Sequence, residues 1–130
     1  IIDANEGSFI FSNNIIKQYE ITLRAQKGSK ISVNTETKSL IVKSVTGSAI
    51  TTKGTSENQE IAIRTGGVYN GANNTVENTD LKIKTGGTAA VRTLNVLDIN
   101  IFAGGDVFIY DTPKQLKQTK IFGGRIIFKD

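Results

Sequence analysis

A glycine-containing corner recurs through the chain in one register, and this repeat limits the fold more than any other feature. The corner is a Gly-Gly or Gly-Ser pair, and it returns every 18 to 21 residues. The stretch before it often alternates aliphatic and charged residues, as in Leu81-Lys82-Ile83, a pattern typical of a strand with one buried face. The seven pairs begin at Gly7, Gly28, Gly47, Gly66, Gly86, Gly104 and Gly123. They predict a repeat protein whose unit is about 19 residues long.

The length and content of this unit indicate a β-solenoid. The unit is too short for a propeller blade and has no helical periodicity. We therefore predict an all-β fold, a single-stranded parallel β-helix of about seven coils, in which equivalent strands stack on one another. Crossovers between parallel strands favour a right-handed helix. The predicted solenoid domain covers residues 1–130, and because the chain begins without Met we expect it to be the trimmed or C-terminal part of a longer exported protein.

The glycines are expected at structural corners, because each coil must turn at the same place while the next coil lies directly against it. Residues three and five positions before and after the first glycine should face inward. The last coil fits less well, since Gln118 and Lys120 fall at inward positions and a slip of one residue would turn Ile121 inward instead. The predicted corner residues are Gly28, Gly47, Gly66, Gly67, Gly86, Gly87, Gly104, Gly105, Gly123 and Gly124.

An antiparallel sandwich or barrel with glycines at bulges is the alternative fold, because regular strand spacing alone permits it. Such folds have no reason to repeat the same corner in the same register. The constant register therefore favours the solenoid.

The composition excludes several classes of function. The chain has no histidine and no cysteine, which excludes Ser-His-Asp triads, Cys-His dyads, histidine-based zinc sites and disulfides. Its net charge of +4 is spread along the chain rather than gathered into a stripe, so we expect no nucleic-acid partner. No apolar run approaches the ~20 residues of a membrane span. We expect no catalytic residue, no metal and no cofactor.

The phrases "IAIRTGG", "LKIKTGG" and "INIFAGG", together with the closing segment "GGDVFIYDTPKQLKQTKIFGGRIIFKD", resemble the GIN domain. This is the head domain of auto-transporter adhesins in Bacteroidetes-type bacteria. The resemblance is closest from residue 38 to the end, and it departs from the family where Asp111 and Thr112 precede Pro113 in place of a glycine. It implies a β-helical, exported, surface-associated protein without catalytic residues.

Two groups of residues are candidates for ligand binding. The polar stretch "VYNGANNTVENT" and the closing segment each combine an aromatic ring with polar side chains, which suits carbohydrate, although turns and corners need the same residue types. Alternatively, Asp106 shapes its corner and Tyr110 packs beside Pro113. The candidates are Tyr69, Asn70, Asn73, Asn74 and Asn78 in the first group, and Asp106, Tyr110 and Asp111 in the second.

The favoured function is a non-enzymatic binding module of the cell surface or envelope, which presents the loops of a rigid β-helix to a glycan or a surface protein. We expect it at the cell surface, in the periplasm or at the outer membrane. The runner-up is a scaffold that polymerises end to end, as bactofilins do, because the apolar strand 125–129 suggests self-association through the terminal coils. The third hypothesis is a carboxylate-based polysaccharide enzyme, because Glu60, Asp80 and Asp98 should stack in consecutive coils.

Overall fold

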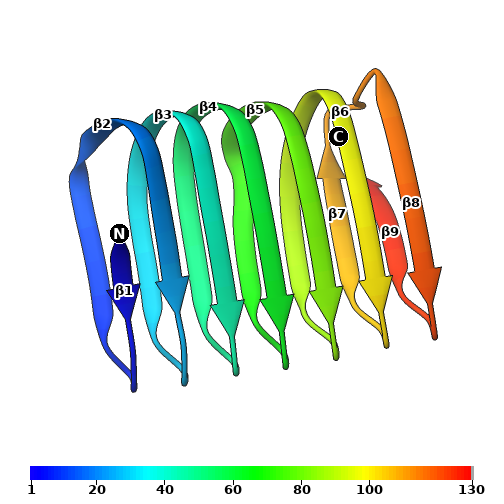
Figure 1. The fold of residues 1–130 in the computed structure, drawn as a ribbon, viewed down its shortest axis with the longest axis horizontal. Helices are drawn as coiled ribbons and strands as arrows, with labels where there is room; N and C mark the ends of the chain where they lie inside the picture. Colours follow the sequence, from blue (N-terminus) through cyan, green and yellow to red (C-terminus); the bar gives the residue numbers. More distant parts are fainter. Residues whose placement is uncertain (130) are drawn as a thin grey trace.

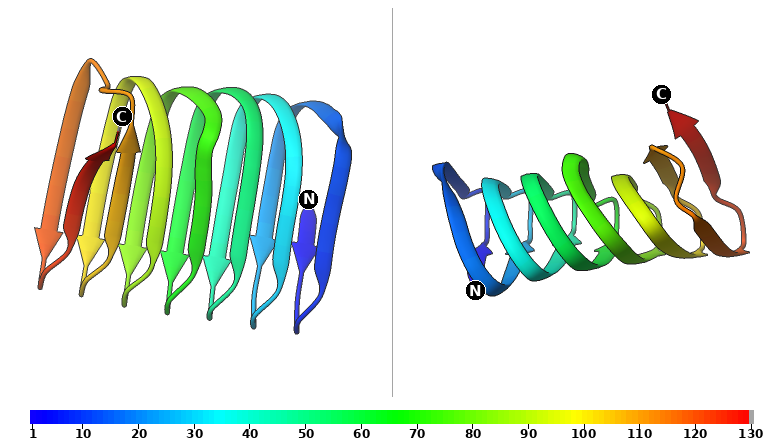
Figure 2. Two further views of the ribbon diagram at one scale, coloured as in Figure 1. Left: turned by 180° about the vertical axis from the view of Figure 1, so that it is seen from behind. Right: turned by 90° about the horizontal axis from the view of Figure 1, so that it is seen from above.

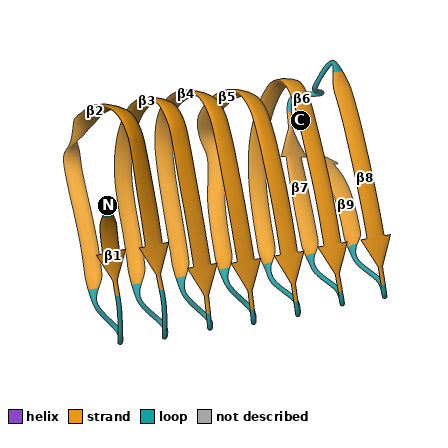
Figure 3. Ribbon diagram, viewed as in Figure 1, coloured by secondary structure: helices purple, strands orange, loops and turns teal. Residues whose placement is uncertain are grey.

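The computed structural model describes residues 1–129, and within them the chain is built from β-strands without a helix (Figures 1 and 3). Five long strands of 15 to 17 residues follow a short first strand, and shorter strands complete the last coils. The strands are β1 (Ile2–Ala4), β2 (Phe9–Ala25), β3 (Lys30–Val45), β4 (Ala49–Arg64), β5 (Val68–Lys84), β6 (Thr88–Phe102), β7 (Asp106–Tyr110), β8 (Gln115–Ile121) and β9 (Arg125–Lys129).

Each long strand makes most of one coil, and the coils stack side by side (Figure 1). The chain rises on the far side, bends over a wide arch, descends on the near side and enters a tight turn. Its advance from β1 toward β9 makes the helix right-handed, as the view from above also shows (Figure 2). All strand pairs are parallel, in the order β1-β2-β3-β4-β5-β6-β7-β9 with β8 on β6. The predicted parallel β-solenoid is thus confirmed, and the sandwich is excluded.

The inward residues near the tight turns form continuous aliphatic columns. Val42 pairs with Ile61, Ile61 with Leu81, and Leu81 with Ile99, and these side chains are almost completely buried. Near the arch the inward side chains are mixed, and the buried Gln59 stacks between Leu40 and Thr79. The interior therefore contains a cluster of polar side chains beneath the arch within an otherwise largely aliphatic core.

The tight turns have the signature of type I′ β-turns, which require positive φ at both central residues. In the turn at Thr46 and Gly47, φ is +54° and +71°, and the Ser48 amide donates a hydrogen bond of 3.3 Å to the Val45 carbonyl. The expected corner glycines all lie in these turns, but the first left-handed position is occupied by a residue other than glycine. That position holds Glu6, Lys27, Thr46, Thr65, Thr85, Ala103 and Phe122.

Thr65→Asn is expected to stabilise the protein by about 0.5–1 kcal/mol, because asparagine tolerates the left-handed region far better than a β-branched residue. Thr65 has φ +52° and an exposed side chain, so no packing is lost. The matched control is Thr55→Asn on exposed strand backbone, which should be neutral or slightly destabilising. Urea unfolding followed by circular dichroism measures both, and a midpoint for Thr65→Asn at or below that of Thr55→Asn would contradict the strain argument.

The last coil keeps the register of the others, so the expected slip at Ile121 is wrong. Gln118 stacks on Ile99, Lys120 on Ile101 and Ile121 on Phe102. Ile121 therefore lies on the outer surface, where it is 45% exposed. The backbone ladder fixes this register, and the two polar side chains can occupy inward positions because no further coil covers them in the structure.

Candidate functional site

The descending halves of the central coils form a surface that we call the front face, made of the outward residues of segments 41–45, 60–64, 80–84 and 98–102. Parallel pairing aligns these residues in columns that run along the solenoid axis. One column stacks Ile41, Glu60, Asp80 and Asp98, as the sequence predicted for its three acids. Two residues further along each strand, a second column contains Lys43, Ala62, Lys82 and Asn100.

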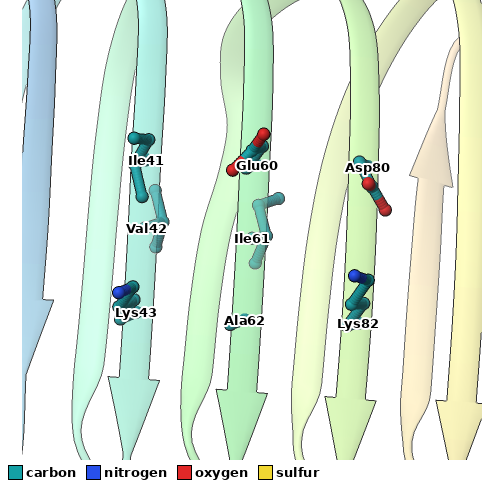
Figure 4. A pocket seen from close by; sticks show the side chains of 8 residues that line it. All are labelled: Ile41, Val42, Lys43, Glu60, Ile61, Ala62, Asp80 and Lys82. Carbon is teal, nitrogen blue, oxygen red and sulfur yellow. The ribbon is translucent and has the colours of Figure 1, made fainter.

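A hollow of about 170 Å³ lies on the front face at Ala62 (Figure 4). Ala62 is the smallest side chain of its column and stands between Lys43 and Lys82, so room is left where its neighbours carry long side chains. The hollow is lined by Ile41, Val42, Lys43, Glu60, Ile61, Ala62, Asp80 and Lys82. We call it the Ala62 hollow.

The charged groups around this hollow have no partners among residues 1–129. Neither lysine forms an ion pair with Glu60 or Asp80, although opposite charges occupy neighbouring columns. The Oδ1 atom of Asp80 is shielded from solvent and accepts no hydrogen bond from the described residues. The arrangement thus offers two ammonium groups and two carboxylates to a ligand. Even so, no three His, Cys, Asp or Glu residues of the described chain are grouped closely enough to hold a metal ion.

An asparagine ladder borders the Ala62 hollow on the side of the arch. Asn95 donates a 3.2 Å hydrogen bond from Nδ2 to Oδ1 of Asn78, and Asn78 donates one of the same length to Asn58. A shallow depression of about 320 Å³ runs beside this ladder and shares Glu60 and Asp80 with the Ala62 hollow. Amides therefore extend the same polar surface across three coils.

An exposed aromatic ring borders the hollow on the side of the tight turns. A depression of about 110 Å³ is lined by Phe102, Asn100 and Lys82, and it shares Lys82 with the Ala62 hollow. Phe102 is 48% exposed and meets Phe122 edge to face at 5.8 Å between ring centroids. The three depressions thus form one surface, which we call the front strip, with amides at one end, charges in the middle and an aromatic ring at the other.

The structure corrects the ligand-binding role predicted for Tyr69 and Asn74, because both side chains are fully buried. The Tyr69 hydroxyl donates to Oε1 of Gln59 at 2.6 Å and lies 2.6 Å from the hydroxyl of Thr52. Asn74 donates to the same Gln59 oxygen at 3.2 Å. Burial raises the pKa of Tyr69 to about 12, despite the hydrogen bonds, which act in the other direction. These residues form the polar interior beneath the arch rather than a surface for ligand.

The other amides of that stretch remain accessible, but they are not gathered at one place. Asn78 belongs to the asparagine ladder of the front strip. Asn70, near the start of β5, and Asn73, toward the arch, are exposed away from it. Of these three asparagines, Asn78 therefore contributes to the front strip, whereas Asn70 and Asn73 do not.

The second predicted group is separated by the structure. Asp106 and Asp111 lie at opposite ends of β7, each paired with an arginine: Arg125 donates to Asp106 at 2.9 and 3.2 Å, and Arg92 donates to Asp111 at 2.6 Å. The hydrogen bond from Arg125 lowers the pKa of Asp106. The Tyr110 ring has the Arg92 guanidinium 5.8 Å from its centroid. Asp111 has φ +62°, so it adopts the left-handed conformation where the resembling family carries a glycine.

In the strand expected to self-associate, inward and outward side chains alternate at the end of the solenoid. In β9, Ile126 and Phe128 stack on the inward Val107 and Ile109, whereas Ile127 stacks on Phe108 outside. Phe128 is 56% exposed at this end of the solenoid. Self-association through the terminal coils stays a prediction.

Ala62 and the two lysines beside it were missed as site residues. The signal that could have found them is the second column itself, in which an alanine interrupts longer polar side chains two positions after the acids. The alanine can be placed between the two lysines only once the coils are stacked in register, and the glycine repeat gives that register.

The comparisons with known proteins identify a family. The sequence model described as "Putative auto-transporter adhesin, head GIN domain" matches residues 1–113. The match includes β1 to β7 and the front strip up to Phe102, whereas the closing segment after Pro113 lies outside it. No curated protein and no solved structure matches the chain significantly. In the described part of the chain, no helix has the length and apolar character needed to cross a membrane.

Proposed function

The chain belongs to the auto-transporter adhesin head GIN domain family, and we propose that it is a non-enzymatic binding module of the exported, cell-surface type that holds its ligand on the front strip. The family description speaks of an adhesin. The ligand class in this proposal is a surface glycan or a surface protein. The proposal differs from the sequence-based expectation in its site, since it moves the contact from the loop at Tyr69 to the descending strands.

The observation that carries the proposal is the Ala62 hollow with its unpaired charges. Charged side chains on strand surfaces commonly pair across neighbouring strands. Here Lys43, Lys82, Glu60 and Asp80 surround one depression without doing so. The same chain does form surface ion pairs elsewhere, as between Arg92 and Asp111. Unpaired groups around a hollow are available to a ligand.

The rigidity of the scaffold supports a binding role as well. The front strip lies on strands whose backbone hydrogen bonds are made with the coils on either side. The backbone of such strands is held more firmly than that of loops, so binding costs little backbone ordering entropy. This favours recognition by a preformed surface.

Ala62→Gln is the direct test, because it fills the hollow without removing a charge. We expect retention on an array of glycans and matrix proteins to fall to about a tenth of the wild-type level or lower. A loss of ~1.4 kcal/mol in binding free energy lowers the affinity tenfold. The fold should be unaffected, because the site is an outward strand position.

The matched control is Ala49→Gln, which places the same side chain on an outward position at the start of β4, away from the front strip. It should bind like the wild type. If Ala62→Gln and Ala49→Gln are both retained as well as the unaltered protein, the front strip is not the binding surface.

A further inference from the structure

We propose that the Ala62 hollow takes an acidic sugar, whose carboxylate lies between the ammonium groups of Lys43 and Lys82 while its hydroxyls donate to Glu60 and Asp80. This rests on the proposed function of the front strip and names the chemistry of its ligand. The unit is a uronic or sialic acid type of residue within a glycan.

The anion-binding side of the hollow is built by the lysine column. Lys43 and Lys82 are separated by one coil, that of Ala62, so their backbones are roughly 10 Å apart at ~4.8 Å per coil. Figure 4 shows Lys43, Ala62 and Lys82 in a row on three neighbouring coils, and both lysine side chains are long and flexible enough to reach over the alanine when an anion enters. Because neither ammonium has an acidic partner among residues 1–129, no ion pair must be broken when an anion enters.

The hydroxyl-binding side is built by the acid column. Glu60 and Asp80 stand at paired positions of adjacent coils, and ionised carboxylates can only accept hydrogen bonds. Oδ1 of Asp80 is the atom with a clear deficit, since it is shielded from water and unpartnered. The rest of this half-buried side chain is accessible to a ligand hydroxyl, and a rotation of the carboxylate would bring Oδ1 to the donor, which satisfies a group that is costly to leave unpaired.

The two sides together exclude simpler ligands. A group with negative charge alone would meet repulsion from Glu60 and Asp80, and a simple cation would meet it from Lys43 and Lys82. A neutral sugar would satisfy the carboxylates and leave the ammonium groups unused. A single acidic sugar carries both a carboxylate and hydroxyl donors, and the hollow of about 170 Å³ suits one such unit better than a larger ligand.

A sugar also fits the neighbourhood better than a peptide does. Extended peptides are usually bound by free backbone groups at a sheet edge. Here the strands under the hollow already pair with coils on both sides, which leaves side chains as the means of recognition. The flanking amide ladder and the exposed Phe102 ring suit the hydroxyls and the apolar faces of adjoining sugars.

The experiment is an amide NMR titration of the ¹⁵N-labelled chain with three acidic probes, which are trigalacturonate, 3′-sialyllactose and a hyaluronan tetrasaccharide. Each is paired with the same sugar after reduction of its carboxylate to an alcohol. We expect at least one acidic probe to shift the Ala62 amide and its neighbours, and its reduced form to bind about tenfold more weakly. Lys43→Gln with Lys82→Gln should cause a similar loss, as expected from two partly exposed charge contacts.

The control is Lys30→Gln with Lys53→Gln, which makes the same change in net charge on the ascending halves of β3 and β4. Its affinity should equal that of the wild type. If the control variant loses as much affinity as the double variant in the hollow, the loss is explained by net charge alone, and the proposal is overturned.

The remaining outcomes separate this inference from the proposed function. Equal shifts at Ala62 from acidic and reduced probes would overturn the acidic-sugar assignment and leave the front strip as a binding surface. The same conclusion follows if no sugar binds, but the chain is retained on an arrayed protein and Ala62→Gln loses that retention. If the Ala62 amide responds to no probe and Ala62→Gln changes nothing on the array, both proposals fail.

Discussion

Gly54→Ala is expected to lower the free energy of unfolding by about 3 kcal/mol or more, the sum of a backbone term and a steric term. Gly54 lies in β4 beneath the arch with φ +126°, a value that residues with a side chain rarely adopt. A Cβ atom there would be 2.0 Å from the carbonyl oxygen of Thr35 in the preceding coil. That oxygen belongs to backbone, so it cannot move aside as a flexible side chain does.

The matched control is Gly66→Ala in a tight turn. Gly66 has φ +77°, but an added Cβ would have no atom within 4 Å. The substitution therefore isolates the backbone term, and we expect a loss of about 1 kcal/mol. Urea unfolding followed by circular dichroism gives both values, compared through their midpoints because repeat proteins can depart from two-state behaviour. Equal losses in the two variants would mean that the coils shift to admit the methyl group at Gly54.

Gly54 also shows where the sequence ceased to be informative. The tight corners could be predicted because they return in every coil, and the aliphatic columns beside them followed from strand alternation counted from each glycine. Gly54 lies in the variable stretch, where no repeat marks it. What makes it necessary is the approach of Thr35 from the preceding coil, a tertiary contact that its own sequence neighbours do not reveal.

Tyr69 and Asn74 were misjudged for two different reasons. Tyr69 stands three residues after Gly66, the first glycine of its pair, at a position that the repeat itself marks as inward, so the sequence held the correct answer. Asn74 lies beyond an irregularity in pairing between β4 and β5, where the register shifts between Thr51 and Lys53. An extra residue reverses which side chains face inward, so alternation cannot be extended through the arch.

One part of the candidate site could be predicted from the sequence, and the other part could not. The column of Glu60, Asp80 and Asp98 followed from the repeat, and so in principle did the lysine column beside it. The hollow itself did not, because it depends on how far the long side chains extend around Ala62 and on their failure to pair. Those are properties of side-chain geometry rather than of residue type.

Stability is expected to fall steeply between about pH 10 and pH 12 through Tyr69. The folded-state pKa of about 12 lies above the ordinary value of 10.0, because burial disfavours the phenolate. The contribution of the neutral phenol is thus fully present below pH 10, and it is lost as pH rises toward 12. A difference of about two units corresponds to about 2–3 kcal/mol, since each unit is ~1.4 kcal/mol. Unfolding midpoints measured at intervals from pH 8 to pH 12 follow this loss.

Tyr69→Phe isolates the contribution of this buried phenol to stability. At pH 8 the variant should be less stable by about 1–2 kcal/mol, because Gln59 and Thr52 lose a buried hydrogen-bond partner. As pH approaches 12 its disadvantage should vanish or reverse, since it has no phenol to ionise. Tyr19→Phe, which removes a phenol that is 70% exposed, should follow the wild-type curve. A constant gap between Tyr69→Phe and wild type from pH 8 to pH 12 would show that the buried hydroxyl does not control the alkaline limit, and that the polar interior beneath the arch admits water.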